Sequence, residues 1–304
     1  MIIPPYLKPG DTIAINCPAG FMAADKAAAC ISTLQNEGYH IVVGKTMGSA
    51  SQTYFSGTDE ERCEELQGFL DDKNIKAILF GRGGYGTGRI IDRLNFKKFI
   101  KNPKWLIGFS DITILHTHLF SNFRIAAMHA PMAAAFNDGG DSNPYTLSLL
   151  SALRGEKANY QTTTHPFNRP GYAKGKLIGG NLSLLAHVAG TASDINTKKC
   201  ILFIEDIGEQ LYNIDRMLYQ LKRNGKFEQL AGLIIGGFTD MKDTERPFGK
   251  NVYEIIQELV AEYDYPVCFN FPVSHEKENL ALKTGVKYKL TVDITGCDLL
   301  ELCL

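Results

Sequence analysis

Short apolar runs and helical patterns alternate along the first half of the chain. The apolar runs are TIAINC, YHIVVG, KAILF and WLIGF, and the helical patterns between them are DKAAACISTLQNEG, TDEERCEELQGFLDD and TGRIIDRLNF. Short apolar runs bounded by turn residues are typical of buried strands, and apolar positions spaced by three or four predict helices. Strands and helices that take turns predict parallel βαβ units, whose ligands bind at the carboxyl ends of the strands. We therefore expect an α/β fold with an N-terminal parallel sheet.

A polar, turn-rich stretch at residues 156–172 interrupts this pattern and predicts a domain connection. Beyond it, the apolar runs KCILFIED, LAGLIIGGF, PVCFNF and VKYKLTVD alternate with the helical patterns YNIDRMLYQLKRNGKF and NVYEIIQELVAEY. This order favours a second α/β domain with β-rich ends. We expect an N-terminal domain over residues 1–155 and a C-terminal domain over residues 173–304.

Composition excludes several classes of protein. Apolar residues make up 44% of the 304 positions and charged residues 21%, which is typical of soluble globular chains. A formal net charge of -1 gives no broad field for nucleic acid or anionic lipid. No apolar run approaches the roughly 20 residues that cross a bilayer, and the N-terminus lacks a signal-peptide pattern. We expect a cytoplasmic protein without nucleic-acid or membrane partners, whose seven scattered cysteines are small buried residues or inert thiols.

Ser110 lies where the apolar run WLIGF ends and the helical pattern ITILHTHLF begins. A nucleophile at a sharp strand-to-helix turn has its hydroxyl exposed above the sheet, and the N–H of the next residue, Asp111, can hold an oxyanion. The second glycine of the G-x-S-x-G motif is replaced here by Ile112. Serine is also a favoured helix N-cap, so the local pattern leaves both roles open.

The glycine-rich stretch GRGGYG at residues 81–86 fits the G-x-G-x-x-G pattern of dinucleotide-binding loops. It follows about the third strand rather than the first, and no acidic residue is clearly placed for a ribose, which argues against that use. The same glycines could point backbone N–H groups into a cleft and stabilise a developing oxyanion. A turn that only needs glycine for its positive φ is the alternative.

A carboxylate pair and a late histidine could activate a serine. Glu205 and Asp206 end the apolar run CILFIED, and His275 lies in the loop FNFPVSHEKEN. A carboxylate at a strand end can hold an imidazole in one tautomer, although both acids could instead cap the next helix. A metal site is not expected, because His116 and His118 would face different sides of a helix and no paired-cysteine motif is present.

In the order RGGYG, IGFSD, GGNL, FIEDIGEQLYNIDRML and a late loop histidine, the sequence resembles the LD-carboxypeptidases, a family of cytoplasmic serine peptidases. The resemblance runs through almost the whole chain. It implies an N-terminal nucleophile domain like the sheet of class I glutamine amidotransferases, a C-terminal domain that supplies Glu and His, and an active site between them. It also implies that Ser110 is the nucleophile, His275 the general base and acid, and Glu205 the residue that orients His275. Where the family often has glycine before the histidine, this sequence has Ser274.

The resemblance further implies a substrate and its contacts. The substrate would be a murein tetrapeptide whose terminal D-alanine is attached to the L-centre of diaminopimelate or lysine. The oxyanion hole would come from the N–H groups of Asp111 and of a glycine, expected to be Gly84, and substrate contacts are expected at Tyr85 and Arg82. The D-alanine carboxylate needs a partner, for which Arg82, Arg89 and the loop amides are candidates. No cofactor is expected, and the protein is expected to form a homodimer. A microcin C-type self-immunity peptidase and a non-catalytic dinucleotide-binding module are the alternatives.

Overall fold

The computed structural model describes residues 1–303, apart from the side chain of residue 141, and divides the chain into two compact units. Unit 1 comprises residues 1–156 and 280–283, and unit 2 comprises residues 157–279 and the chain from residue 284 onward. The chain therefore leaves unit 1, returns to it for one short segment and leaves again. Nothing in the hydrophobic pattern indicates this return.

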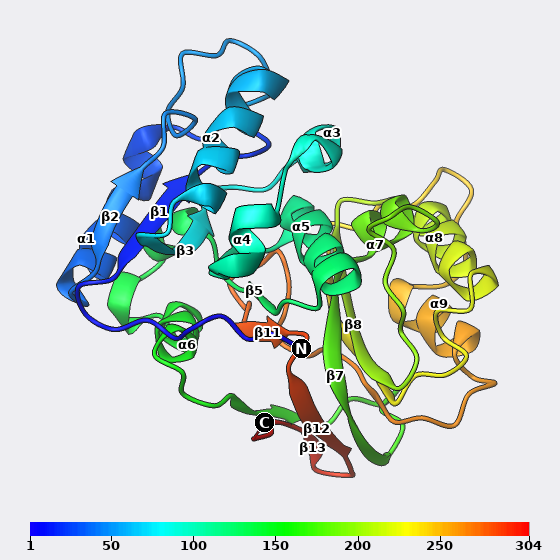
Figure 1. Cartoon of the computed structure of the whole chain (residues 1–304). Coiled ribbons are helices and arrows are strands. Elements are labelled where there is room, and N and C mark those ends of the chain that lie inside the picture. The colour runs from blue at the N-terminus through cyan, green and yellow to red at the C-terminus, as the bar shows by residue number, and fades with distance from the viewer. Residues whose placement is uncertain (304) are drawn as a thin grey trace. The chain divides into compact units, whose positions relative to one another are not determined.

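Unit 1 is built around a six-stranded sheet in the order β11-β5-β4-β3-β1-β2 (Figure 1). β1 pairs in parallel with β2 and β3, and β4 pairs in parallel with β3 and β5. The parallel sheet expected from the alternation of strands and helices is thereby confirmed. The strands are β1 (Thr12–Asn16), β2 (His40–Val43), β3 (Ile75–Phe80), β4 (Trp105–Gly108), β5 (Ala127–His129) and β11 (Leu282–Thr284).

Capping residues mark the first turns of α2 and α6 in unit 1. Thr58 forms a capping box at the start of α2, in which its hydroxyl accepts from the Glu61 N–H and the Glu61 carboxylate accepts from the Thr58 N–H. Asn143 caps α6, whose first residue is Pro144. The helical segments are η1 (Ala24–Ala27), α1 (Ala28–Asn36), α2 (Asp59–Asp71), α3 (Thr87–Ile90), η2 (Ile91–Arg93), α4 (Lys97–Lys101), η3 (Ser110–Ile112), α5 (Thr113–His118), the π-helical η4 (Leu119–Phe123), η5 (Ala133–Asn137), η6 (Gly140–Ser142) and α6 (Pro144–Leu153).

Unit 2 contains a seven-stranded sheet in the order β10-β9-β8-β7-β12-β13-β6. Its first four strands are parallel, and β12, β13 and β6 continue the sheet in antiparallel pairs. The expected second α/β domain is confirmed, and the polar stretch at residues 156–172 includes β6. The elements are β6 (Asn159–Thr163), β7 (Gly171–Asn181), α7 (Leu182–Val188), β8 (Cys200–Ile207), α8 (Leu211–Arg223), β9 (Gly232–Thr239), α9 (Val252–Leu259), β10 (Val267–Cys268), β12 (Lys287–Val292) and β13 (Gly296–Glu301).

Most of the cysteines lie in the interior of the protein. All seven cysteines are free thiols, and all except Cys303 are buried. In the part of the chain that the structure describes, no helix combines the length and the apolar character that a bilayer span requires.

Candidate active site

Ser110 occupies a strained turn at the carboxyl end of β4. Its φ of 61° lies in the left-handed region, which is uncommon for residues other than glycine and costs free energy. The residue lies inside the first turn of η3, whose N-cap is Phe109, and neither η3 nor α5 has a side-chain cap. The N-cap role that the sequence left open is therefore not the role of Ser110. A strained strand-to-helix turn is the geometry in which nucleophilic serines are presented above a sheet.

Gly83 is the glycine that packs directly against Ser110. A Cβ atom on Gly83 would lie 2.9 Å from Ser110 Cβ, 3.2 Å from Ser110 Oγ and 3.3 Å from the Asp111 nitrogen. The Gly83 carbonyl accepts a hydrogen bond from the Gly20 N–H at 3.0 Å. Because C=O and N–H point in opposite directions across a trans peptide, the Gly84 N–H is directed away from Gly20. Gly84 itself has a φ of 93°, which favours glycine.

The side chain of Asp111 connects the serine turn to the end of the glycine-rich loop. Asp111 is fully buried, and its Oδ2 accepts a hydrogen bond from the Thr87 N–H at 2.7 Å. Thr87 begins α3, so a carboxylate already occupies the first amide of that helix. Because a pyrophosphate would meet this negative charge, the contact argues against a dinucleotide at the loop.

The two arginines near the glycine-rich loop differ in their ionic partners. Arg89 is held by the Asp59 carboxylate, with Nε at 2.9 Å and Nη2 at 2.7 Å from its oxygens. Arg82 is exposed and donates from Nη1 to the Phe21 carbonyl at 2.8 Å, but it forms no ion pair with any carboxylate whose position the structure describes. Tyr85, also from this loop, is 51% exposed. Arg82 therefore retains a positive charge that a substrate carboxylate could use.

Glu205 and His275 meet inside unit 2. His275 Nδ1 lies 2.6 Å from Glu205 Oε2, and the side chains are 13% and 0% exposed. Burial would lower the pKa of His275, but the charge of Glu205, its hydrogen bond and the charge of Asp206 together raise that pKa above its usual range. A buried carboxylate accepts the proton on Nδ1, which leaves Nε2 as the basic nitrogen.

Two consecutive glycines in β9 allow the histidine loop to approach Glu205. A Cβ atom on Gly236 would collide with the Val273 carbonyl oxygen and would lie 3.1 Å from Glu205 Cβ. A Cβ atom on Gly237 would lie 2.5 Å from Ser274 Cβ, and the Gly237 N–H donates to the Val273 carbonyl at 2.9 Å. The glycines of LIIGGF, which the sequence analysis did not single out, are therefore what lets the loop lie against the strand.

Ser274 closes a turn in the histidine loop. Its hydroxyl accepts from the Glu276 N–H and donates to the Glu278 carbonyl, both at 3.0 Å. The residue is only 4% exposed. This chain thus uses a buried hydroxyl to fix the backbone on both sides of His275.

Asp206 points its carboxylate at the start of α7. It accepts from Asn181 Nδ2 at 2.8 Å, from the Ser183 N–H at 3.0 Å and from the Ile207 N–H at 2.9 Å. Burial, reinforced by the charge of Glu205, raises the pKa of Asp206 to about 7. The adjacent acids therefore have different partners. Glu205 is hydrogen-bonded to the His275 imidazole, and Asp206 is hydrogen-bonded to residues at the start of α7.

The two histidines of α5 lie in apolar surroundings. Burial lowers the pKa of His116 to about 4, and the His118 ring lies 5.2 Å from the ring of Phe96. Among the side chains that the structure describes, no group of three or more His, Cys, Asp or Glu is arranged to hold a metal ion.

Comparison with known proteins identifies the family. The model of the LD-carboxypeptidase N-terminal domain matches residues 13–130, and that of the C-terminal domain matches residues 174–290. A Bacillus subtilis protein named "Probable murein peptide carboxypeptidase" is 33% identical over 287 residues, which cover 93% of this chain and 90% of that protein. The murein tetrapeptide carboxypeptidase of Pseudomonas aeruginosa is 30% identical, with 90% and 91% covered. This chain belongs to the LD-carboxypeptidase family.

Solved structures agree with this assignment. The muramoyltetrapeptide carboxypeptidase from Oxalobacter formigenes superposes with a TM-score of 0.84 at 27% identity, over 96% of this chain and 99% of that one. The resemblance stated from the sequence and the α/β fold class are confirmed. The likeness to class I glutamine amidotransferases stays a prediction.

Proposed function

We propose that this protein is a serine-type LD-carboxypeptidase that releases the terminal D-alanine of murein tetrapeptides. The observation that carries the proposal is the buried 2.6 Å hydrogen bond between His275 and Glu205, since it prepares an imidazole to act as a base. The substrate class is supported by relatives of 30% and 33% identity that are named for murein peptides.

Proton transfer follows from the tautomer of the histidine. The proposal requires the Ser110 hydroxyl to come within hydrogen-bond reach of His275 Nε2. Nε2 then accepts the proton as Oγ attacks the carbonyl of the L-configured residue, and Glu205 stabilises the imidazolium that forms. His275 returns the proton to the nitrogen of the leaving D-alanine. A water molecule repeats the sequence on the acyl-enzyme and regenerates Ser110.

The oxyanion of the tetrahedral intermediate needs donors that are fixed before the reaction begins. We assign this role to the N–H groups of Asp111 and Gly84. The small space left by Gly83 beside Ser110 Oγ supports the assignment, because a side chain there would obstruct the substrate carbonyl.

We assign the carboxylate of the D-alanine to Arg82 and a further substrate contact to Tyr85. Arg82 is favoured over Arg89, because Arg89 is already paired with Asp59. A charge-assisted hydrogen bond from a guanidinium gives both affinity and orientation. The substrate's own carboxylate would thus direct cleavage to the last residue.

The proposal includes a cytoplasmic location, a role in cell-wall recycling and a homodimer. Light scattering on the purified chain tests the oligomeric state. The alternative that the resemblance implies, a microcin C-type self-immunity peptidase, would act on a peptidyl-nucleotide antibiotic with the same three residues. The microcin C7 self-immunity protein of Escherichia coli is 27% identical to this chain. Both substrate classes are therefore offered to the enzyme in the functional assay.

One assay measures free D-alanine from tetrapeptides that carry diaminopimelate or lysine, without added metal or nucleotide, and a parallel assay measures cleavage of a peptidyl-nucleotide. We expect release by the wild type, and a loss of several orders of magnitude in Ser110→Ala and His275→Ala. Ser151→Ala, on α6, is the matched control and should keep full activity. Cleavage of only a peptidyl-nucleotide would favour the immunity activity, and NADH binding without any cleavage would favour the dinucleotide module.

A further inference from the structure

Arg62 is a charged side chain buried on the inner face of α2. It is 0% exposed and shares this face with Leu66 and Leu70, one and two helical turns further along. Burying a guanidinium is costly unless its donors are well paired, and an apolar residue would satisfy helix packing alone. The polar contacts of Arg62 are therefore the feature that needs a functional explanation.

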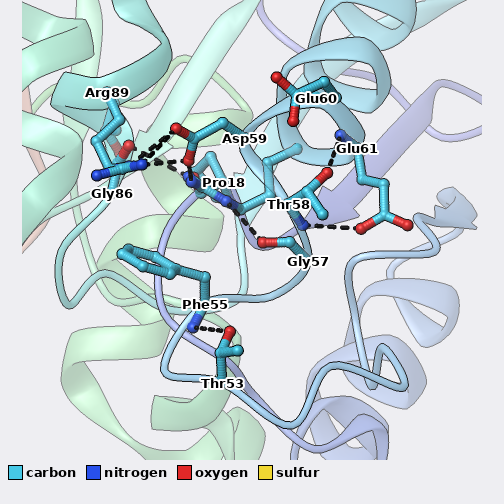
Figure 2. A network of polar contacts seen from close by, with 12 residues as sticks. Pro18, Thr53, Phe55, Gly57, Thr58, Asp59, Glu60, Glu61, Gly86 and Arg89 are labelled. Atoms are coloured by element: carbon cyan, nitrogen blue, oxygen red, sulfur yellow. Dashed lines mark hydrogen bonds and ion pairs between the residues drawn. The ribbon is translucent and has the colours of Figure 1, made fainter.

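The guanidinium of Arg62 donates to main-chain carbonyls of three separate segments. Nη1 donates to the Pro18 carbonyl at 2.5 Å and to the Gly86 carbonyl at 3.2 Å, and Nε donates to the Gly57 carbonyl at 3.3 Å. Pro18 follows β1, Gly57 precedes α2 and Gly86 ends the glycine-rich loop. Figure 2 shows these three residues in one network of polar contacts with Asp59. One side chain thus ties together three loops.

The charge of Arg62 is satisfied within the same network. Its Nη2 forms an ion pair with Asp59. The Asp59 carboxylate also holds Arg89 (Figure 2). The Phe55 ring centroid lies 4.9 Å from Arg62 Cζ, within the range of a cation–π contact. The guanidinium is therefore held in one orientation by its partners.

The glycine-rich loop is anchored on both sides of Gly84. Gly86 has a φ of 148°, and a Cβ atom there would lie 2.8 Å from Arg62 Nη1. On the other side of Gly84, the Gly83 carbonyl accepts from the Gly20 N–H at 3.0 Å. The Gly84 amide, to which we assign an oxyanion contact, lies between these two anchors.

We propose that Arg62 is a positioning residue that holds the oxyanion-binding amides in place through the Gly86 and Pro18 carbonyls. This inference rests on the proposed function. Donors that stabilise a transition state must be fixed to within a fraction of an ångström, whereas ground-state binding tolerates more movement. Loss of this clamp therefore lowers kcat and leaves substrate binding nearly intact.

Two matched pairs of variants test the inference in the full-length protein. Arg62→Lys keeps the charge but loses the fork of donors, and Arg93→Lys makes the same change at an exposed ion pair with Glu60. Asp59→Asn loosens the clamp without altering Arg62, and Glu60→Gln removes the same charge from the same first turn of α2. Circular dichroism shows whether each variant is folded.

The readouts are kcat and KM for D-alanine release, and the affinities of the tripeptide product and of a peptide boronic acid. The boronic acid forms a tetrahedral adduct with serine and so imitates the transition state. We expect Arg62→Lys to lower kcat and boronic-acid affinity by about 10- to 100-fold, with KM and tripeptide affinity within about twofold of wild type. Asp59→Asn should show the same pattern at about 3- to 10-fold, and both controls should match wild type.

Chemical rescue adds a readout that a purely structural role would not produce. Millimolar guanidinium should restore part of the kcat of Arg62→Ala, and urea at the same concentration should not. A folded Arg62→Lys with wild-type kcat, or with equal losses of tripeptide and boronic-acid affinity, would overturn the inference. If the Arg62 variants do not fold, wild-type kcat in Asp59→Asn would overturn it. A wild-type protein that releases no D-alanine would instead overturn the proposed function, and this inference with it.

Discussion

Replacing Gly83 by alanine is the sharpest steric test of the serine turn. The added Cβ would lie 2.9 Å from Ser110 Cβ and 3.2 Å from Ser110 Oγ, and contacts under 3.0 Å require the backbone or the serine to move. The φ of Gly83 is not in the left-handed region, so alanine strains no dihedral angle and acts through its methyl group alone. Displacements of a few tenths of an ångström at the reacting atoms should lower kcat by about 10- to 100-fold, or roughly 1.4–2.8 kcal/mol of transition-state stabilisation.

The assay compares kcat and KM for D-alanine release and the rate of fluorophosphonate labelling in Gly83→Ala and Gly68→Ala. Gly68 lies in α2, where a Cβ atom would meet nothing within 4 Å, so alanine there should keep activity and stabilise the helix by up to about 1 kcal/mol. Overpacking at Gly83 should cost about 1–3 kcal/mol of unfolding free energy. A folded Gly83→Ala with wild-type kcat and wild-type labelling would show that this contact does not shape the site.

Three further changes probe charge. In wild type, the acid limb of the kcat/KM profile should lie above the ordinary imidazole pKa of 6.5, because the raised pKa keeps His275 protonated to higher pH. Glu205→Gln should move this limb to lower pH, and a limb that does not move would contradict the role of Glu205. The folded protein holds a proton on Asp206 that the unfolded chain releases, so the free energy of unfolding should fall as the pH rises from about 4 to about 7. Urea titrations of Asp206→Asn should show a free energy of unfolding that depends less on pH. The same pH dependence as wild type would contradict the raised pKa of Asp206. Arg82→Gln should raise KM by about 10- to 100-fold with kcat little changed, and an unaltered KM would remove Arg82 from the carboxylate site.

The sequence predicted the elements whose residues are buried on both faces or follow a helical period. β3, β4 and β8 appear where the apolar runs KAILF, WLIGF and CILFIED occur, since central parallel strands need apolar side chains on both faces. It did not predict β6 or β11. β6 alternates between exposed and half-buried polar residues because it is an edge strand, and β11 is three residues long and takes its place through a long-range pairing.

The candidate site shows the same division between local and long-range information. Ser110, Glu205 and His275 carried local signals, because each follows an apolar run in a motif of the family. Gly83 carried no local signal that set it apart from the other glycines of its loop, because its role comes from its contact with Ser110, which lies far along the chain. Arg62 could have been found from its position, four and eight residues before Leu66 and Leu70, on the buried stripe of a helix. The acidic residues around it made it resemble an exposed helix face.

The central claim is that the Ser110 hydroxyl is made nucleophilic by the His275 imidazole. The most direct measurement is peptide mapping by mass spectrometry after incubation with a fluorophosphonate, on wild type, Ser110→Ala and His275→Ala. The account predicts a single adduct on Ser110 in wild type, which is absent from Ser110→Ala and slowed by several orders of magnitude in His275→Ala. Labelling of another residue, or undiminished labelling of Ser110 in His275→Ala, would contradict it.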